Sequence, residues 1–184
     1  SYDWNYNLTI ASIKKLKKEG NPNCLVVLGG ANAEIDPNDN LKFLKDNPCV
    51  DYVVYGDGEK PFSNIVKNYI ENPDIDTIKA VPIDGCRALV EDKIVSGKSS
   101  DVVMSLDEIP SPYLTGIFDE LLKNETLMPI IQNIRGCPYR CRYCVSGTQF
   151  GKIRHFSLDR IKEEIEYLRE NAKNRFLRFS DDNF

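Results

Sequence analysis

The sequence predicts an α/β protein built in two parts, a parallel sheet covered by helices and then the beginning of a second strand–helix–strand unit. Short apolar runs that end in glycine occur at residues 24–30 and 50–56, and segments with helical spacing of apolar residues alternate with them. From residue 129 another apolar run, a loop with clustered cysteines, a helical segment and a final apolar run follow. Alternating strands and helices are typical of a parallel sheet with helices on both faces.

The first elements are a helix and a buried strand. Residues 7–18 have helical spacing, and Gly20 with Pro22 ends that helix. The run Cys24–Gly30 is short, continuous and apolar, which is typical of a strand buried on both faces of a parallel sheet.

The same pattern is then repeated. We expect a short helix near Leu41–Lys45, followed by a second buried strand at Val50–Gly56. Pro61 suits the beginning of a helix that extends to about Ile70, because its missing N–H costs nothing in the first turn.

Residues 78–126 change in character. Ile78–Ile83 is compatible with a further strand, and two apolar segments around Glu91-Asp92 predict a small hairpin. Glycine, serine and proline then become frequent, with a short helical segment near Ile117–Lys123. We therefore expect a first domain at 1–95, a linker at 96–126 and a second domain that begins at 127.

The second domain begins with a strand at Pro129–Ile134, and Ser157 is a candidate N-cap for a helix with an apolar stripe. A second strand, Phe176–Phe179, precedes Ser180-Asp-Asp-Asn-Phe184. One strand–helix–strand unit can neither close a barrel nor bury both of its faces. The sequence therefore predicts that the chain is a piece of a longer protein.

Composition excludes several classes of function. The chain has a net charge of −4 and one histidine, which argues against a nucleic-acid partner. It has no apolar run long enough to span a membrane and no start typical of a signal peptide. Of six cysteines, three stand alone and three lie close together, which in a cytoplasmic protein indicates a metal or catalytic site.

The clustered cysteines are Cys137, Cys141 and Cys144, spaced C-x3-C-x2-C directly after the strand that ends near Ile134. Cysteine thiolates hold iron–sulfur clusters, usually four to a cluster. Three ligands leave one iron of a [4Fe–4S] cluster open, as a reacting metal requires. Arginines at 135, 140 and 142 place positive charge near such an anionic cluster.

A structural zinc site is the alternative for this loop. Zinc takes four ligands, commonly as two spaced pairs, and no second pair is present. His155 lies eleven residues after Cys144, outside the usual spacing.

The motif Cys137-x3-Cys141-x-Tyr143-Cys144 resembles the signature of the radical S-adenosylmethionine (SAM) superfamily. The resemblance implies that the loop follows the first strand of a partial (β/α)6 barrel and that the three cysteines hold a [4Fe–4S] cluster, whose open iron binds SAM. It also implies that Tyr143 contacts the adenine through its backbone, and that an electron donor such as flavodoxin or ferredoxin reduces the cluster. Asp181 and Asp182, after the second strand, match the position of acidic residues that bind the ammonium group of SAM.

The order of motifs before the cysteine loop resembles that of cobalamin-binding radical SAM enzymes, which place a flavodoxin-like domain ahead of the barrel. The resemblance implies that five residues after the two buried strands line cobalamin: Gly29, Gly30, Gly56, Gly58 and Glu59. Ordinary turns of an α/β domain are the alternative for these glycines. The Asp-x-His-x-x-Gly motif of proteins that ligate cobalamin through histidine is absent from the sequence.

The resemblance thus implies a cobalamin-dependent radical SAM enzyme, with methyl transfer to an unactivated carbon as the expected reaction and an unknown substrate. Ring formation or rearrangement stays open as the reaction. Two further alternatives concern the class of protein. The first is a radical SAM enzyme without cobalamin, and the second is a non-catalytic module with a structural metal in the cysteine loop.

Overall fold

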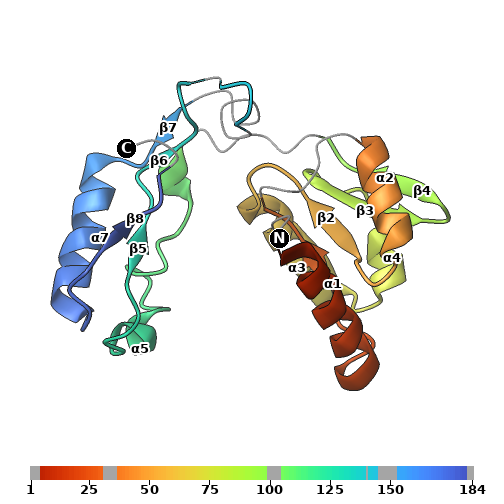
Figure 1. Cartoon of the computed structure of the whole chain (residues 1–184), viewed down its shortest axis with the longest axis horizontal. Helices are drawn as coiled ribbons and strands as arrows, with labels where there is room; N and C mark the ends of the chain where they lie inside the picture. The colour runs from red at the N-terminus through yellow and green to blue at the C-terminus, as the bar shows by residue number, and fades with distance from the viewer. Residues whose placement is uncertain (1–4, 31–36, 99–104, 140, 145–152, 182–184) are drawn as a thin grey trace. The chain divides into compact units, whose positions relative to one another are not determined.

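The chain divides into two compact units, unit 1 (residues 1–102) and unit 2 (residues 103–184), each described by itself. Figure 1 shows their helices and strands. The computed structural model describes residues 5–30, 37–98, 105–139, 141–144 and 153–181.

Unit 1 contains a four-stranded sheet in the order β1-β2-β3-β4. β1 (Val27–Leu28) and β2 (Tyr52–Val54) run parallel, whereas β3 (Cys86–Val90) and β4 (Lys93–Ser96) add as antiparallel strands. The sheet is therefore mixed and not wholly parallel as expected. β3 joins the sheet antiparallel to β2, and the hairpin predicted at Glu91-Asp92, whose two turn residues have φ of 45° and 63°, then returns the chain as antiparallel β4.

Helices cover both faces of this sheet. Ile10 of α1 and Leu44 of α2 pack with Val53 on one face. On the opposite face, helices α3 and α4 pack on Tyr52 and Val54, because alternate residues of a strand point to opposite sides. The helices are α1 (Tyr6–Lys15), its π-helical continuation η2 (Leu16–Gly20), α2 (Pro37–Asp46), α3 (Glu59–Glu71) and α4 (Ile75–Lys79).

The segment Ile78–Ile83, compatible with a strand by its sequence, forms none, and helix α4 occupies part of it. Asp74 caps this helix, with its carboxylate accepting hydrogen bonds from Asp76 N at 3.3 Å and from Thr77 Oγ1. Ile78 is 3% exposed and packs in the core, so its apolar character reflects helix burial and not a strand.

Unit 2 combines a parallel strand pair with an antiparallel one. β5 (Ile130–Ile131) pairs with β8 (Arg178–Phe179) in parallel, and the crossover between them contains α7 (Leu158–Asn171). β6 (Ile134–Arg135) pairs with β7 (Arg154–His155) in the antiparallel sense. Ser157 caps α7 as expected, its Oγ accepting a hydrogen bond from Arg160 N at 3.2 Å.

The segment expected to link the domains lies in unit 2 from residue 103. It contains η3 (Leu106–Glu108) and α5 (Asp119–Leu122). Tyr113 and Leu122 are buried in the core of the unit together with Leu168 of α7. These residues therefore support the strand that leads to the cysteine loop.

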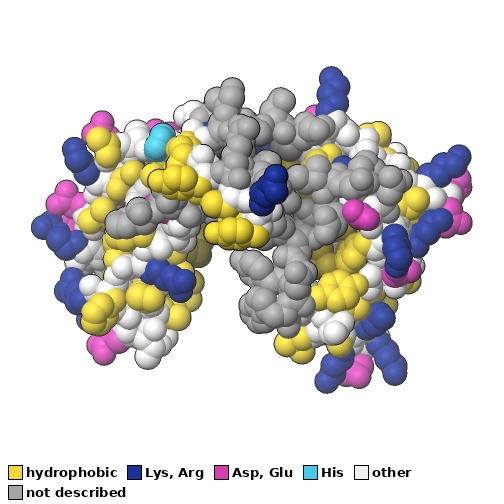
Figure 2. Space-filling model, turned by 45° about the horizontal axis from the view of Figure 1, so that its top comes forward, with side chains coloured by type: hydrophobic (Ala, Val, Ile, Leu, Met, Phe, Trp, Pro, Cys, Tyr) yellow, Lys and Arg dark blue, Asp and Glu magenta, His cyan; other side chains and the backbone are white. Residues whose placement is uncertain are grey.

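Several large hydrophobic side chains of unit 2 remain at the surface, where Figure 2 shows yellow patches among the charged side chains. Ile130, Phe176 and Phe179 are among them. In the described part of the chain, no helix has both the length and the apolar character needed to cross a membrane.

Candidate functional site

The cysteine loop begins directly after β6. Gly136 is buried and has a φ of 93°, a conformation that side chains disfavour, so glycine is required where the chain leaves the strand. Cys137, Cys141 and Cys144 follow as half-buried free thiols. Cys144 N donates a hydrogen bond to Cys141 O at 3.0 Å, which places these two cysteines on one tight turn.

The three thiols have the chemistry of an iron–sulfur ligand set but do not converge in this conformation. Among the described residues, no group of three or more histidine, cysteine or acidic side chains is arranged to hold a metal ion. A metal-ligand set is rarely assembled before the metal binds. The donor set therefore fits a cluster by its soft thiolate ligands, and metal binding would have to draw the thiols together.

Two tyrosine side chains of the loop are too exposed for packing to account for their presence. Tyr143 is 92% exposed and Tyr139 is 63% exposed, so neither ring contributes to a core. Arg142 is also exposed, whereas half-buried Arg135 donates from Nε to Gln132 Oε1 at 2.9 Å. Arg140 lies outside the described residues. An exposed aromatic ring beside candidate metal ligands is available to a ligand or a partner.

Asp181 accepts hydrogen bonds from the segment that leads from β5 to this loop. Its Oδ1 accepts hydrogen bonds from Asn133 N at 2.6 Å and Ile134 N at 3.0 Å, and its Oδ2 accepts one from Asn133 Nδ2 at 3.0 Å. Asn133 Oδ1 is buried and has no hydrogen-bond partner among the described residues. Asp182 lies outside the described residues. Asn133 was not among the candidates from sequence, although a polar amide inside an apolar strand was a signal for it.

The glycines of unit 1 lie after β1 and β2, whose parallel pairing brings their carboxyl ends to one edge of the sheet. A Cβ on Gly29 would lie 3.2 Å from Val54 O, so close packing of the strands explains this glycine without a ligand. Gly56 has a φ of 72° and open space where a Cβ would point, and Gly30 has a φ of 103°.

The remaining two candidates at this edge begin helix α3. Gly58 is its N-cap residue, and Glu59 is exposed in its first turn. A Cβ on Gly58 would meet only Val54 Cγ1, at 3.8 Å. Among the described residues, the open space beside Gly56 is compatible with a ligand at this edge.

Residues 131–184 match the radical SAM superfamily. The resemblance inferred from the cysteine motif is therefore confirmed, and residues 131–184 are called the radical SAM segment below. The match begins at Ile131, the last residue of β5, and includes the cysteine loop, α7 and β8.

Curated relatives extend the similarity over nearly the whole chain. The chain is 30% identical over 178 residues, 92% of its length, to 2-(S-pantetheinyl)-carbapenam-3-carboxylate methyltransferase of Streptantibioticus cattleyicolor. It is 30% identical over 185 residues, 96% of its length, to the cobalamin-dependent radical SAM methyltransferase TokK of Streptomyces tokunonensis. It is 29% identical over 175 residues, 94% of its length and 36% of the relative, to an uncharacterized methyltransferase of Pyrococcus horikoshii. The chain spans about a quarter of the first two relatives, 25% and 26% of their lengths.

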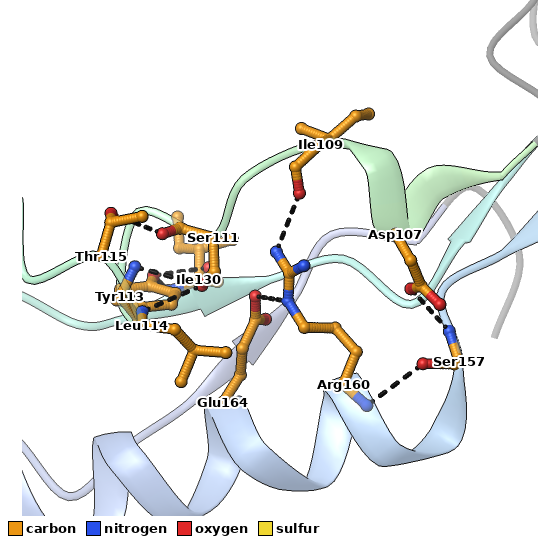
Figure 3. A network of polar contacts seen from close by, with 10 residues as sticks. All are labelled: Asp107, Ile109, Ser111, Tyr113, Leu114, Thr115, Ile130, Ser157, Arg160 and Glu164. Atoms are coloured by element: carbon orange, nitrogen blue, oxygen red, sulfur yellow. Dashed lines mark hydrogen bonds and ion pairs between the residues drawn. The ribbon is translucent and has the colours of Figure 1, made fainter.

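A polar network attaches helix α7 to the residues that precede the radical SAM segment (Figure 3). Arg160 donates from Nε to Glu164 Oε1 at 2.8 Å and from Nη2 to Ile109 O at 3.1 Å. Asp107 Oδ1 accepts a hydrogen bond from Ser157 N at 3.0 Å, and this bond holds the pKa of the Asp107 carboxyl below its ordinary value. The segment that contains Asp107 and Ile109 is thereby attached to the beginning of α7.

Tyr113 closes one edge of β5. Its hydroxyl donates to Ile130 O at 2.6 Å and accepts from Ile130 N at 3.0 Å. The other edge of the strand pairs with β8, where Arg178 N donates to Pro129 O and Ser180 N donates to Ile131 O. Both edges of the strand that leads to the cysteine loop are therefore hydrogen-bonded.

Replacing Tyr113 with phenylalanine is expected to destabilise unit 2. The change removes two part-buried hydrogen bonds to the backbone of Ile130, and a typical intramolecular hydrogen bond contributes about 0.5–1.5 kcal/mol to stability. Urea unfolding followed by circular dichroism measures the loss. Tyr139→Phe is the matched control, because that ring is 63% exposed and its variant should unfold with the wild-type midpoint. Equal midpoints for the two variants would show that the Tyr113 hydroxyl contributes nothing.

Proposed function

We propose that this chain serves a cobalamin-dependent radical SAM reaction, with methyl transfer as the reaction class. The observation that carries the proposal is the C-x3-C-x2-C loop directly after β6, with three half-buried free thiols and an exposed tyrosine before the last of them. The methyltransferase names of the similar proteins support the reaction class. The substrate and the activity of the whole protein are part of the proposal.

In this proposal Cys137, Cys141 and Cys144 hold a [4Fe–4S] cluster as thiolates and leave one iron for SAM. When bound, the cluster and SAM supply the radical that abstracts hydrogen from a substrate. The residues of the chain itself would bind and orient the cluster and SAM. The positive charges of Arg135 and Arg142 favour the anionic cluster, and an electron donor such as flavodoxin or ferredoxin would approach the exposed loop.

The SAM contacts are assigned to Tyr143 and to one of the two acidic residues after β8. Tyr143 would contact the adenine through its backbone. For the ammonium group we favour Asp182, because the Asp181 carboxylate already accepts three hydrogen bonds from Asn133 and Ile134. A carboxylate has about four acceptor sites, so Asp181 retains little capacity for a further ligand.

The domain organisation proposed is a partial flavodoxin-like, cobalamin-binding domain at 1–95, a linker at 96–126 and the first βαβ unit of a partial (β/α)6 barrel at 127–184. Helices on both faces of the unit 1 sheet support the first part. The parallel β5–β8 pair with α7 in its crossover supports the last part. Cobalamin would bind at the edge formed by Gly29, Gly30, Gly56, Gly58 and Glu59.

The deciding experiment reconstitutes the full-length protein anaerobically with iron and sulfide and records the electron paramagnetic resonance spectrum of the reduced sample with and without SAM. We expect a [4Fe–4S] signal that SAM perturbs and that a Cys141→Ala variant lacks. A signal indifferent to SAM, or zinc in place of iron in the metal analysis, would contradict the proposal and favour a structural metal.

Cobalamin binding needs a separate measurement. The full-length protein is mixed with hydroxocobalamin, excess ligand is removed, and the corrin absorbance that remains with the protein is recorded. We expect stoichiometric retention. Protein that retains no corrin but has a SAM-responsive cluster would be a radical SAM enzyme whose first domain has another role.

A further inference from the structure

The hydrogen bonds between β5 and β8 end at Ser180, immediately before Asp181. Arg178 N donates to Pro129 O at 3.0 Å and Ser180 N donates to Ile131 O at 2.9 Å. Beyond Ile131 the chain turns from β5 into β6, which pairs with β7 instead. The N–H groups of Asn133 and Ile134 at this turn are satisfied by one side-chain oxygen, Asp181 Oδ1.

The turn held by Asp181 determines how the chain enters the cysteine loop. Ile134 and Arg135 form β6, Gly136 is buried with a φ of 93°, and Cys137 follows at once. Asp181 is 47 residues from Ile134 in sequence, so this contact is a tertiary one. Loss of the contact would free both N–H groups and loosen the position from which the three cysteines project.

We propose that Asp181 is a positioning residue for the cysteine loop, and that it acts as a hydrogen-bond acceptor for Asn133 and Ile134. The identity of the group that the loop binds rests on the proposed function. The contact of Asp181 with Asn133 and Ile134 does not depend on that function. The role requires acceptor oxygens and does not require a negative charge. A direct ligand of the SAM ammonium would require the charge.

Asparagine at position 181 separates these two roles. Its amide oxygen can keep both backbone hydrogen bonds, while its NH2 group would face the amide of Asn133. In the described part of the chain Asn133 Oδ1 has no hydrogen-bond partner in the wild type, and rotation of that amide by half a turn would direct this oxygen to the new NH2 group. Asp181→Asn thus keeps the hydrogen bonds and removes the charge, whereas Asp181→Leu removes both.

The first test measures amide hydrogen exchange in the protein without iron. In Asp181→Leu, exchange at Asn133 and Ile134 should accelerate by at least about tenfold, and in Asp181→Asn it should stay within about threefold of wild type. Asp159→Asn is the control for the loss of one negative charge, because Asp159 is an exposed residue in the first turn of α7. Wild-type exchange at both positions in Asp181→Leu would overturn the proposal.

A second pair of variants tests the contact if Asp181→Leu does not fold. Asn133→Asp places two carboxylates against each other and should accelerate exchange at Ile134. Adding Asp181→Asn to Asn133→Asp again places one amide donor opposite one carboxylate acceptor. The exchange rate at Ile134 should then return towards that of wild type. Failure of the double variant to recover, with Asn133→Asp alone accelerated, would show that the pair does not act as inferred.

The third test uses the reconstituted protein. Asp181→Asn should retain the iron content and the SAM-induced spectral change of wild type, whereas Asp181→Leu should lose iron. Loss of the SAM response in Asp181→Asn, with normal exchange and normal iron, would make Asp181 a charged ligand and overturn the positioning role. If wild type itself takes up no iron, the proposed function fails, and the exchange measurements still decide the role of Asp181.

Discussion

Replacing any one of Cys137, Cys141 and Cys144 with alanine is expected to reduce the iron retained after anaerobic reconstitution to the background of a protein-free sample. Each thiolate would supply one of three protein ligands, and a cluster left with two ligands has two exposed irons. Iron and sulfide content after desalting, with the absorbance of the bound cluster, measures this effect. It is the largest expected change of function from one substitution in the chain.

Loss of iron in these variants should not come from unfolding. The three cysteines are half-buried and belong to none of the described hydrophobic clusters, so alanine removes little core packing. Cys24→Ala is the matched control, because Cys24 is also a half-buried free thiol but packs beside the core of unit 1. Iron loss in Cys24→Ala, or full iron content in one of the loop variants, would contradict the assignment.

The cysteines that stand alone differ from those of the loop. Cys86 is 1% exposed in the core of unit 1, and burial raises the pKa of its thiol to about 12. A thiol with such a pKa is almost wholly protonated at neutral pH and is a poor metal ligand. The sequence suggested this difference through spacing alone, because single cysteines beside apolar runs are usually small buried side chains.

Local patterns allowed much of the fold to be predicted. The Ser157 N-cap and the hairpin at Glu91-Asp92 depend on neighbouring residues, and both are present. Ile78 shows the limit of such patterns, because a short apolar segment suits a strand or a buried helix equally well. Its assignment depended on Asp74, a helix cap that the apolar pattern does not reveal.

The site could be predicted only where the residues that supply its chemistry lie close together in the sequence. The spacing of the cysteines identifies the loop, but the contacts of Asp181 with Asn133 and Ile134 join segments that are far apart in sequence. Gly29 is a similar case. The close approach of Val54 O, which requires a small residue at this position, joins two strands that are apart in sequence.

Gly97→Ala is expected to destabilise unit 1 strongly, because the added methyl group has no room. A Cβ at this position would lie 2.5 Å from Asp84 N and 2.6 Å from Ile83 C, and also against Asp84 Oδ1. Two of these atoms belong to the backbone and cannot rotate away. Overpacking of this kind costs about 1–3 kcal/mol and occasionally more, a large share of the roughly 5–15 kcal/mol that stabilises a domain.

The destabilisation arises at the corner where the residues before β3 meet the residues after β4. Gly97 N donates to Ile83 O at 3.1 Å, Gly85 N to Lys98 O at 3.0 Å, and Lys98 N to Asp84 Oδ1 at 2.7 Å. An added methyl group must separate the two segments and so weaken all three bonds. Urea unfolding should therefore show a lower midpoint for Gly97→Ala. Ser63→Ala is the control, because Ser63 is exposed inside α3 and alanine favours the helix there, so its midpoint should not fall below that of wild type. An unchanged midpoint for Gly97→Ala would mean that this corner opens in solution and that the hairpin does not depend on it.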